Sequence, residues 1–444
     1  MTEHVHTVVV GAGIAGLAAA TEAAEYGDVA VFDARSHPGG IIRSERIDGY
    51  LCESAAASVT LPASGTSTLV ATSGAGTDLV SADPAARRRW IHYPEGLLEV
   101  PASPPAAVKS RILNSWEKLG ALAEVFEPKL AENREESVAD FLTRRFGAQV
   151  AARLAQPAVA GIFAGQASRI SVDAAFPTLR EMDKEGGVIR SGLRRMRHAR
   201  AAGIPRPALA SFRDGMQTLP RYLARGLGEQ LQLDTQVGAV EATADGWRVD
   251  AGDDVFDCDR LVLACEPESA SKLLADTDTA LAELLTRVVR APVTIVHLGI
   301  DGDSLGEHQG FGFLAHPKGG LRILGCVFDS VIFPERAPRG SALVRVLMGG
   351  RLRPEDAALS EAGSVDLAVQ DLAWALGRDV DPVFSRVTHQ TAGIPQYELG
   401  HLEHVRQVDA RAAALGRLAL VGWGYRGIGV NSAVADAISA VRSL

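Results

Sequence analysis

Three glycines near the amino end, Gly11, Gly13 and Gly16, follow the spacing G-x-G-x-x-G. In a dinucleotide site the first glycine allows a tight turn, the second lets backbone approach the pyrophosphate, and the third permits close packing of a helix on a strand. The N–H groups that start such a helix attract phosphate oxygens. Asp33 follows Gly16 by 17 residues and can accept hydrogen bonds from a ribose. The spacing predicts a dinucleotide site, with a glycine turn that binds no ligand as the alternative.

That chemistry requires a strand before the first glycine and a helix after the last. Residues 5–10 are mostly β-branched, residues 17–25 are helix formers, and residues 29–33 predict a second strand, so a βαβ unit is expected. A strand, loop and helix are expected again from residue 418 to the end. Elsewhere, helices are expected within 109–160, and strands at 231–237, 245–250, 260–265, 291–300, 321–328 and 342–348.

The composition excludes several classes of protein. A chain of 444 residues is expected to form two or three domains, and 22% charged with 47% hydrophobic residues argues against disorder. The 45 Lys and Arg against 54 Asp and Glu give a net charge of −9, so nucleic acid is not an expected partner. The four cysteines are far apart and form no CxxC pair, so neither a metal site nor a disulfide framework is expected.

Two features bear on where the protein acts. The amino end lacks a basic, apolar signal segment, and no apolar run reaches the roughly 18 residues that span a bilayer. We therefore expect a cytoplasmic protein, or one bound peripherally to the cytoplasmic membrane. Residues 184–206 hold seven Lys and Arg against one acid. We interpret this stretch as a solvated helix face or loop, with an anionic membrane surface as the alternative partner.

A second group of glycines follows the expected βαβ unit. Gly39 and Gly40 lie in a segment, residues 34–44, that resembles the glycine-doublet motif of flavoproteins in the amine oxidase and protoporphyrinogen oxidase superfamily. Residues 420–431 resemble the closing flavin motif of the same superfamily, in which a helix starts beneath the flavin. Together these resemblances imply FAD, and not NAD, as the cofactor. Arg43 would face a phosphate or the isoalloxazine, or else form a surface salt bridge.

The resemblance implies a set of FAD-contacting residues: Gly11, Ala12, Gly13, Ile14, Ala15, Gly16, Asp33, Ala34, Arg35, Gly39, Gly40, Ile41, Ile42, Ala55, Ala56, Ala57, Ser58, Val237, Gly422, Trp423, Ile428, Gly429 and Val430. The N–H groups that start the last helix would face the pyrimidine end of the flavin and favour its anionic reduced form. No catalytic side chain is named, because flavin N5 would carry the chemistry.

Six further segments occur in the order in which the protoporphyrinogen oxidase family carries them, and the chain resembles that family over essentially its whole length. They are residues 89–101, 136–147, 156–165, 211–220, 310–314 and 328–334. The resemblance implies an oxygen-dependent, six-electron oxidation of protoporphyrinogen IX to protoporphyrin IX in haem biosynthesis. Hydride would pass to flavin N5, dioxygen would be the second substrate, and hydrogen peroxide would be the by-product. A ferrochelatase and a second copy of the chain are open partners.

The implied fold is α/β plus α+β. A Rossmann-like FAD-binding domain is interleaved with a mixed-sheet substrate domain and with a helical domain of the kind that docks on membranes. The FAD-binding domain is expected to comprise residues 1–80, 208–288 and 396–444. The substrate domain takes residues 81–108 and 289–395, and the helical domain takes residues 109–207.

The implied substrate sets what its site should look like. A tetrapyrrole is a broad apolar disc with propionates, so its site should be apolar with a cation at one edge. By the family motif Arg89 is the propionate partner, although a surface arginine beside Arg87 and Arg88 is the alternative. The remaining expected substrate contacts have ordinary core packing as their alternative: Phe311, Gly312, Phe313, Leu314, Leu347 and Met348.

Three other functions stay open. Coproporphyrinogen III oxidation would call for a more basic and more open pocket, because that substrate has two more propionates. Amine oxidation on the same fold is less well supported, since the paired aromatic cage and a flavin-adjacent lysine are not recognisable. A non-catalytic flavin-binding protein is the third, because Ala55 and Ala56 stand where the family carries Gly and Pro. A Cβ at the glycine position restricts φ and would weaken or shift FAD.

Overall fold

The βαβ unit expected at the amino end is present. β1 (Thr2–Val10) leads through the glycine turn into α1 (Ile14–Ala23), and β2 (Val29–Phe32) returns parallel to β1. The helix begins earlier than expected because Gly13, in an extended conformation, is its N-cap. The computed structural model describes residues 2–101, 106, 109–114, 117, 118, 124 and 134–444.

β1 and β2 belong to a seven-stranded sheet, sheet I, that collects segments from both ends and the middle of the chain. In spatial order its strands are β10 (Leu231–Gln232), β2, β1, β13 (Asp254–Leu263), β12 (Trp247–Ala251) and β11 (Val237–Ala242), with β19 (Leu418–Leu420) also paired to β13. The strands from β10 to β13, together with β19, are parallel, whereas β13, β12 and β11 form an antiparallel meander. The carboxyl ends of the parallel strands meet at one edge, where ligands of open α/β sheets bind.

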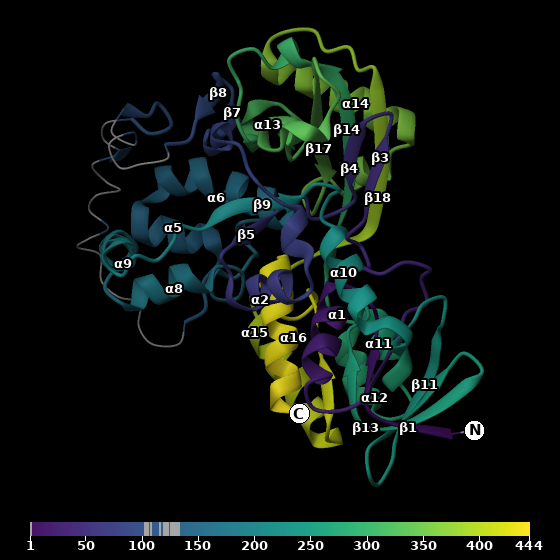
Figure 1. Ribbon diagram of the computed structural model, residues 1–444. Helices are drawn as coiled ribbons and strands as arrows, with labels where there is room; N and C mark the ends of the chain where they lie inside the picture. Colours follow the sequence, from purple (N-terminus) through teal and green to yellow (C-terminus); the bar gives the residue numbers. More distant parts are fainter. Residues whose placement is uncertain (1, 102–105, 107–108, 115–116, 119–123, 125–133) are drawn as a thin grey trace.

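Helices cover both faces of sheet I (Figure 1). Those on one face are α1, α2 (Ser64–Thr72), α10 (Thr218–Leu227) and α16 (Val430–Ser443). Those on the other are α11 (Pro267–Leu274), α12 (Thr279–Leu285) and α15 (His401–Leu415). Val9 faces the first group and Val8 the second, as the two-residue period of a strand requires. The first and last helices of the chain, α1 and α16, lie side by side.

A second seven-stranded sheet, sheet II, lies at the opposite end of the molecule (Figure 1). Its strands in spatial order are β18 (Phe384–Pro395), β14 (Arg290–Asp301), β17 (Ser341–Gly349), β16 (Gly325–Val327), β15 (Gly312–Ala315), β7 (Trp90–Tyr93) and β8 (Gly96–Glu99). β15 and β7 are parallel, and the other neighbours are antiparallel. α14 (Glu361–Leu376) packs on this sheet through a core that contains Val346 and Leu372.

Shorter elements connect the two sheets. β3 (Ser44–Ile47) pairs with β4 (Tyr50–Glu53), and β9 (Ala208–Phe212) pairs with β5 (Val59–Leu61) and β6 (Leu79–Ser81). α13 (Asp329–Ile332) lies beside β17. Short 3₁₀ helices are η1 (Ala75–Asp78), η2 (Pro84–Arg87), η4 (Gly228–Gln230), η5 (Gly302–Leu305), η6 (Pro317–Gly319), η7 (Pro334–Arg336) and η8 (Pro354–Ala358).

A helical part lies to one side of both sheets. It consists of α5 (Val138–Phe146), α6 (Ala148–Phe163), α7 (Val172–Ala175), α8 (Pro177–Lys184) and α9 (Val188–Ala201). The expected helices within 109–160 are present as α5 and α6, and most of residues 109–133 lie outside the described residues. Of the strand expected at 321–328, only Gly325–Val327 pairs. Among the described helices, none has the length and apolar character needed to cross a membrane.

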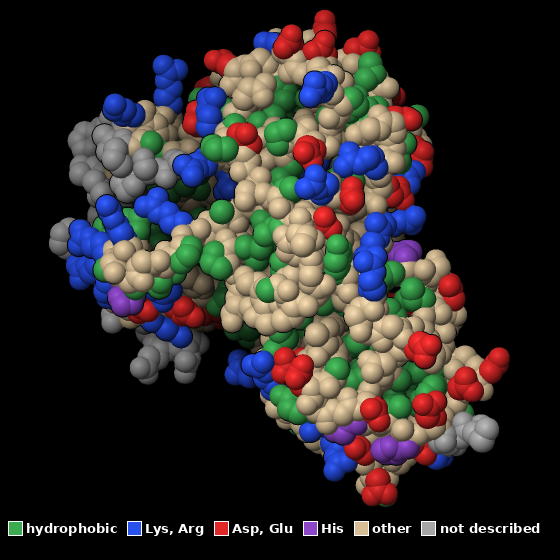
Figure 2. Space-filling model, in the orientation of Figure 1, with side chains coloured by type: hydrophobic (Ala, Val, Ile, Leu, Met, Phe, Trp, Pro, Cys, Tyr) green, Lys and Arg blue, Asp and Glu red, His purple; other side chains and the backbone are tan. Residues whose placement is uncertain are grey.

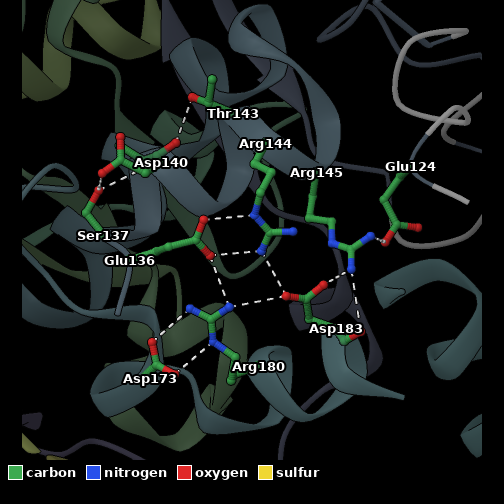
Figure 3. Close-up of polar contacts among 11 residues, drawn as sticks. Glu124, Glu136, Ser137, Asp140, Thr143, Arg144, Arg145, Asp173, Arg180 and Asp183 are labelled. Carbon is green, nitrogen blue, oxygen red and sulfur yellow. Dashed lines mark hydrogen bonds and ion pairs between the residues drawn. The ribbon is translucent and has the colours of Figure 1, made fainter. Parts of the chain in front are cut away.

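A buried ionic cluster holds the helical part together (Figure 3). It joins Arg144, Arg145 and Arg180 to the acids Glu124, Glu136, Asp173 and Asp183. The carboxylate of Asp183, with 3% of its side chain exposed, pairs with Arg144 at 2.8 Å, with Arg180 at 3.2 Å and with Arg145. Burial raises the pKa of the Glu136 carboxyl, but hydrogen bonds from Arg144 and Arg180 outweigh it, so that this pKa lies below its usual value. The cluster ties α5 to α8.

We predict that Asp183→Ala destabilises the protein by about 3–5 kcal/mol, because it removes the carboxylate shared by three guanidinium groups, two of which are buried. The change is measured by urea unfolding followed by circular dichroism. The control is Glu185→Ala, whose carboxylate forms exposed ion pairs with Arg194 and Arg195 and should contribute far less. Equal losses in the two variants would contradict the assignment of the cluster as the stabilising element.

Candidate functional site

A cavity of about 1300 Å³ lies between sheet I and sheet II. Its lining comes from the start of α1, the carboxyl ends of β1 and β2, the loop of residues 54–58, α6, sheet II, and the start of α16. These segments are far apart in sequence, and the cavity is where the amino end, the middle and the carboxyl end of the chain meet. The start of α1 and the start of α16 both open into it, so two helix N-termini offer partial positive charge to one ligand.

The glycine turn before α1 is built from backbone packed on backbone. Gly11 has a φ of +108°, which disfavours any other residue there. At Gly16 a Cβ would lie 1.8 Å from the carbonyl oxygen of Gly11, so only glycine allows α1 to sit directly on the turn. Gly13 lines the cavity, and a Cβ there would meet no heavy atom within 4 Å. The open side of Gly13 is therefore the side from which a ligand approaches.

Asp33 is fixed at the end of β2, on the cavity wall. Its Oδ2 accepts a hydrogen bond from the backbone N–H of Ala12 at 2.6 Å, and its Oδ1 accepts one from the N–H of Arg35 at 2.8 Å. The bond from Ala12 ties the carboxylate to the glycine turn, and the bond from Arg35 fixes it to its own segment. Each carboxylate oxygen can accept more than one hydrogen bond, so ribose hydroxyls can still be bound.

The glycine doublet packs against the first glycine turn. The N–H of Gly39 donates a hydrogen bond to the carbonyl of Ala12 at 2.7 Å. Gly39 also forms an isolated parallel β-bridge with Gly13. A Cβ on Gly40 would lie 3.2 Å from the Cα of Gly13. The two motifs that were predicted separately from the sequence thus form one wall.

The carboxyl-terminal motif completes this wall from the other end of the chain. Gly422 follows β19 with a φ of +123°, and Gly429 is the N-cap of α16. A Cβ at either glycine would meet no heavy atom within 4 Å, and both residues line the cavity. The cradle has the free backbone, the phosphate-attracting helix starts and the ribose acceptor that a dinucleotide cofactor needs. The residues present therefore fit FAD.

Most of the expected cofactor residues line the cavity: Gly11, Gly13, Ile14, Ala15, Asp33, Ala34, Arg35, Gly39, Gly40, Ile41, Ile42, Ala55, Ala56, Ala57, Ser58, Val237, Gly422, Trp423, Ile428, Gly429 and Val430. Ala12 and Gly16 do not reach its surface and support the turn from behind. Arg43 is also away from the cavity, and its guanidinium pairs with Glu45 at 2.9 Å on the surface. That exposed pair is the alternative anticipated for Arg43.

Ala55 and Ala56 do not strain the loop. Neither has a positive φ, so the backbone here adopts a conformation open to any residue. Alanine is therefore compatible with the backbone of this loop, and the expected weakening of FAD binding stays a prediction.

Arg89 lies at the other end of the cavity, directly before β7. It is exposed, and its guanidinium carbon is 4.7 Å from the centre of the Phe311 ring. In the described part of the chain, no ion pair joins Arg89 to a carboxylate, whereas its neighbour Arg88 pairs with Glu99. Stacking on an aromatic face leaves the donors at the edge of a guanidinium available to a ligand.

The other expected substrate contacts divide between cavity and core. Phe311, Gly312, Phe313, Leu314 and Leu347 line the cavity. Phe313 is only 3% exposed, and its ring packs on Phe328 in the core of sheet II. Met348 is fully buried in that same core and does not line the cavity, so its expected role is corrected. Neighbouring residues on a strand point to opposite faces, and Leu347 already occupies the cavity face of β17.

Several residues of the cavity were not predicted from the sequence. Arg345 lies two residues before Leu347 on β17 and shares its face, so strand alternation was the signal for it. Gly161 of α6 faces Leu314, and a Cβ on it would lie 2.4 Å from a methyl carbon of that leucine. Gly161 belongs to the matched segment 156–165, although no role was assigned to it. Gln390 of β18 had no signal in the sequence.

Two cysteines, Cys265 and Cys326, line the cavity. Burial raises the pKa of the Cys265 thiol to about 12 and that of Cys326 well above its usual value, so neither cavity cysteine is a ready nucleophile. Among the described residues no group of three or more His, Cys, Asp or Glu could hold a metal ion.

Comparison with known proteins agrees with this geometry. Residues 14–444 match the family described as flavin containing amine oxidoreductase. The chain is 31% identical to a chloroplastic protoporphyrinogen oxidase of Oryza sativa subsp. japonica, over 92% of this chain and 81% of that protein. It is 23% identical to a coproporphyrinogen III oxidase of Staphylococcus aureus, over 96% of both chains.

A crystal structure from Exiguobacterium sp. 255-15, provisionally described as a protoporphyrinogen oxidase, superposes with a TM-score of 0.83 at 22% identity, covering 100% of this chain and 98% of that one. At that identity the likeness establishes the fold, while the family match covers nearly the whole sequence. The chain belongs to the flavin-containing amine oxidoreductase family, has porphyrinogen oxidases among its relatives, and uses FAD as its cofactor.

Proposed function

We propose that this flavoprotein oxidises a porphyrinogen to the porphyrin, with protoporphyrinogen IX as its substrate. The observation that carries the proposal is the continuity of one cavity, which runs from the FAD cradle into an apolar compartment with Arg89 at its edge. The relatives named protoporphyrinogen oxidase support the same reading.

The apolar compartment suits a macrocycle. Its walls come from sheet II, through Leu314 and Leu347, and from α6, through Leu154 and Ile162. Gly161 lets α6 pack closely against Leu314, so the helix and sheet II meet at this point of the compartment. Close apolar walls exclude water and orient the ring against the cofactor.

Arg89 gives the compartment its polar edge. The protein carries a net charge of −9, which disfavours an anionic substrate unless a local cation binds it. A guanidinium can bind a propionate through two parallel hydrogen bonds. The remaining described cations of the lining are placed differently. Arg345 is paired with Asp329, while Arg35 and Lys272 lie near the dinucleotide sheet.

FAD, when bound, supplies the hydride acceptor, and six electrons require three cycles with dioxygen as the terminal oxidant. The protein binds the porphyrinogen, orients it against the cofactor and excludes water from it. Around the compartment the described lining offers no carboxylate or histidine, so the three protons released with the three hydrides, two from ring nitrogens and one from a meso carbon, leave to solvent. No acid–base side chain is assigned.

Coproporphyrinogen III is the second candidate. The Staphylococcus aureus relative named for that substrate matches this chain over nearly the full length of both proteins. Coproporphyrinogen III is less favoured because it has two propionates more than protoporphyrinogen IX. Among the described residues, Arg89 is the one cation at the edge of the apolar compartment. Amine oxidation is less favoured because Lys272, the lysine of the described lining, lies on α11 beside sheet I and not in the apolar compartment.

The direct test is porphyrin fluorescence under air, with each porphyrinogen offered to the purified, FAD-loaded protein. We expect porphyrin to form enzymatically from protoporphyrinogen IX, with the lower KM of the two substrates. A lower KM for coproporphyrinogen III would transfer the assignment to the second candidate. If neither rate exceeds the rate without protein, the proposal fails.

Arg89→Ala tests the polar edge. We expect KM to rise by about 10- to 100-fold with a small change in kcat, because propionate binding is the same in the ground and transition states. The matched control is Arg87→Ala, which removes an exposed arginine two residues away that does not line the cavity. A fall in kcat without a change in KM would contradict the role given to Arg89.

We also propose a cytoplasmic protein that docks on an anionic membrane through the α9 surface. This surface exposes Arg190, Arg194, Arg197 and Arg200, together with Leu193 at 37% and Met196 at 52%. Figure 2 shows Lys and Arg side chains gathered over the region where Figure 1 places α9. Exposed apolar side chains among arginines suit an interface of anionic lipid headgroups.

Liposome co-sedimentation tests this docking. Binding to anionic vesicles at low salt is expected to fall by about 30-fold or more in Arg197→Glu/Arg200→Glu, since each basic residue near such a surface contributes about 1 kcal/mol. The control, Arg339→Glu/Arg353→Glu, makes the same charge change at exposed arginines outside the helical part. Absence of binding by the parent protein, or equal loss in both variants, would contradict docking through α9.

A further inference from the structure

The loop of residues 54–58 lines the cofactor side of the cavity and has neither regular secondary structure nor a glycine. It connects β4 to β5, and all five of its residues line the cavity. An irregular loop of alanines and serines has little intrinsic stiffness, so something outside it must fix its shape.

Three carbonyl oxygens of this loop accept hydrogen bonds from side chains outside it: Ser54 from Gln390 at 3.2 Å, Ala55 from Arg345 at 3.0 Å, and Ala57 from Arg336 at 2.7 Å. The three donors lie on β18, β17 and η7, so sheet II and its flank hold the loop from one side. The hydroxyl of Ser211 also donates to Ala57, at 3.1 Å.

Two buried carboxylates hold the two arginines in turn. Asp329 is 1% exposed and pairs with Arg345 at 3.1 Å, and Glu53 is fully buried and pairs with Arg336 at 3.1 Å. Burial raises the pKa of the Glu53 carboxyl, against the Arg336 charge that lowers it, and burial lowers the pKa of Arg336. His297 accepts a hydrogen bond from the N–H of Glu53 at 3.2 Å, and burial keeps its pKa well below the usual value. Two acids thus face two guanidinium groups in one buried cluster.

The clamped carbonyls fix the direction of the N–H groups. In a trans peptide the C=O of one residue and the N–H of the next point in opposite directions. The N–H groups of Ala55, Ala56 and Ser58 therefore point away from the clamping side chains. In the described part of the chain none of these three has a protein acceptor, although their residues line the cavity.

We propose that Arg336 and Arg345 are positioning residues for FAD. Held by Glu53 and Asp329, they clamp the 54–58 loop so that its free N–H groups are presented to acceptor atoms of the cofactor. The inference rests on the cofactor and not on the porphyrinogen, so it stands or falls independently of the proposed substrate.

The test is Arg345→Met combined with Asp329→Asn, which removes both charges of one pair and leaves no buried carboxylate unmatched. We expect the dissociation constant of FAD, measured by ultrafiltration of the full-length protein with added FAD, to rise about tenfold. The visible flavin spectrum of the bound fraction should shift as well, because the polarity around the ring changes.

The matched control is Arg145→Met combined with Asp183→Asn, the same chemical change in the ionic cluster of the helical part, whose residues do not line the cavity. It should lower the melting temperature without altering FAD affinity. The proposal is overturned if FAD affinity in the test variant stays within about twofold of the parent, or if both double variants lose FAD equally.

If the double variant does not fold, Arg345→Lys is the alternative test of the proposal. A lysine keeps the charge beside Asp329 but has no planar fork to hold the Ala55 carbonyl at the same time. We expect an FAD dissociation constant about threefold above that of the parent, with an unchanged melting temperature. An unchanged dissociation constant would overturn the proposal.

Discussion

The architecture depends on a contact of backbone with backbone at the first turn of the chain. Gly16 rests on the carbonyl of Gly11, at a place where a Cβ would be 1.8 Å from that oxygen. Gly11 in turn lies against Ala264 at the end of β13. This contact fixes where α1 starts relative to sheet I. The free N–H groups of the helix therefore lie at the edge of that sheet. α16 packs beside α1 and brings a second helix start to the same cavity.

The buried ion pairs and the exposed Arg89 have different roles. Clusters of paired, buried charges lie around Asp183 in the helical part and around Glu53 and Asp329 beneath the cavity loop. Pairing is what makes such burial tolerable, since an unmatched buried ion costs several kcal/mol. Arg89, in contrast, stacks on Phe311 and has no carboxylate partner among the described residues. A cation left without a partner at the edge of an apolar compartment is suited to binding an anionic ligand.

Much of the cofactor site was predictable because its signals are local. Each glycine motif specifies a turn, and the turn follows from a few consecutive residues, as at Gly11 and Gly422. The clamp on the 54–58 loop was not predictable, because Arg345 reaches Ala55 across 290 residues of sequence. Met348 shows a different limit, since a motif identifies a strand but not the face on which each residue lies. Because side chains alternate along a strand, Arg345 lies on the same cavity face of β17 as Leu347, and Met348 lies on the opposite face.

The central claim is that one cavity brings a porphyrinogen to the flavin. Anaerobic titration of the FAD-loaded protein with protoporphyrinogen IX tests it most directly, because dioxygen is removed and the flavin itself reports the electron transfer. The account predicts that the visible flavin absorbance bleaches as porphyrin appears, with three flavins reduced for each porphyrin formed. A flavin that stays oxidised with either porphyrinogen, but is bleached by an amine, would contradict it.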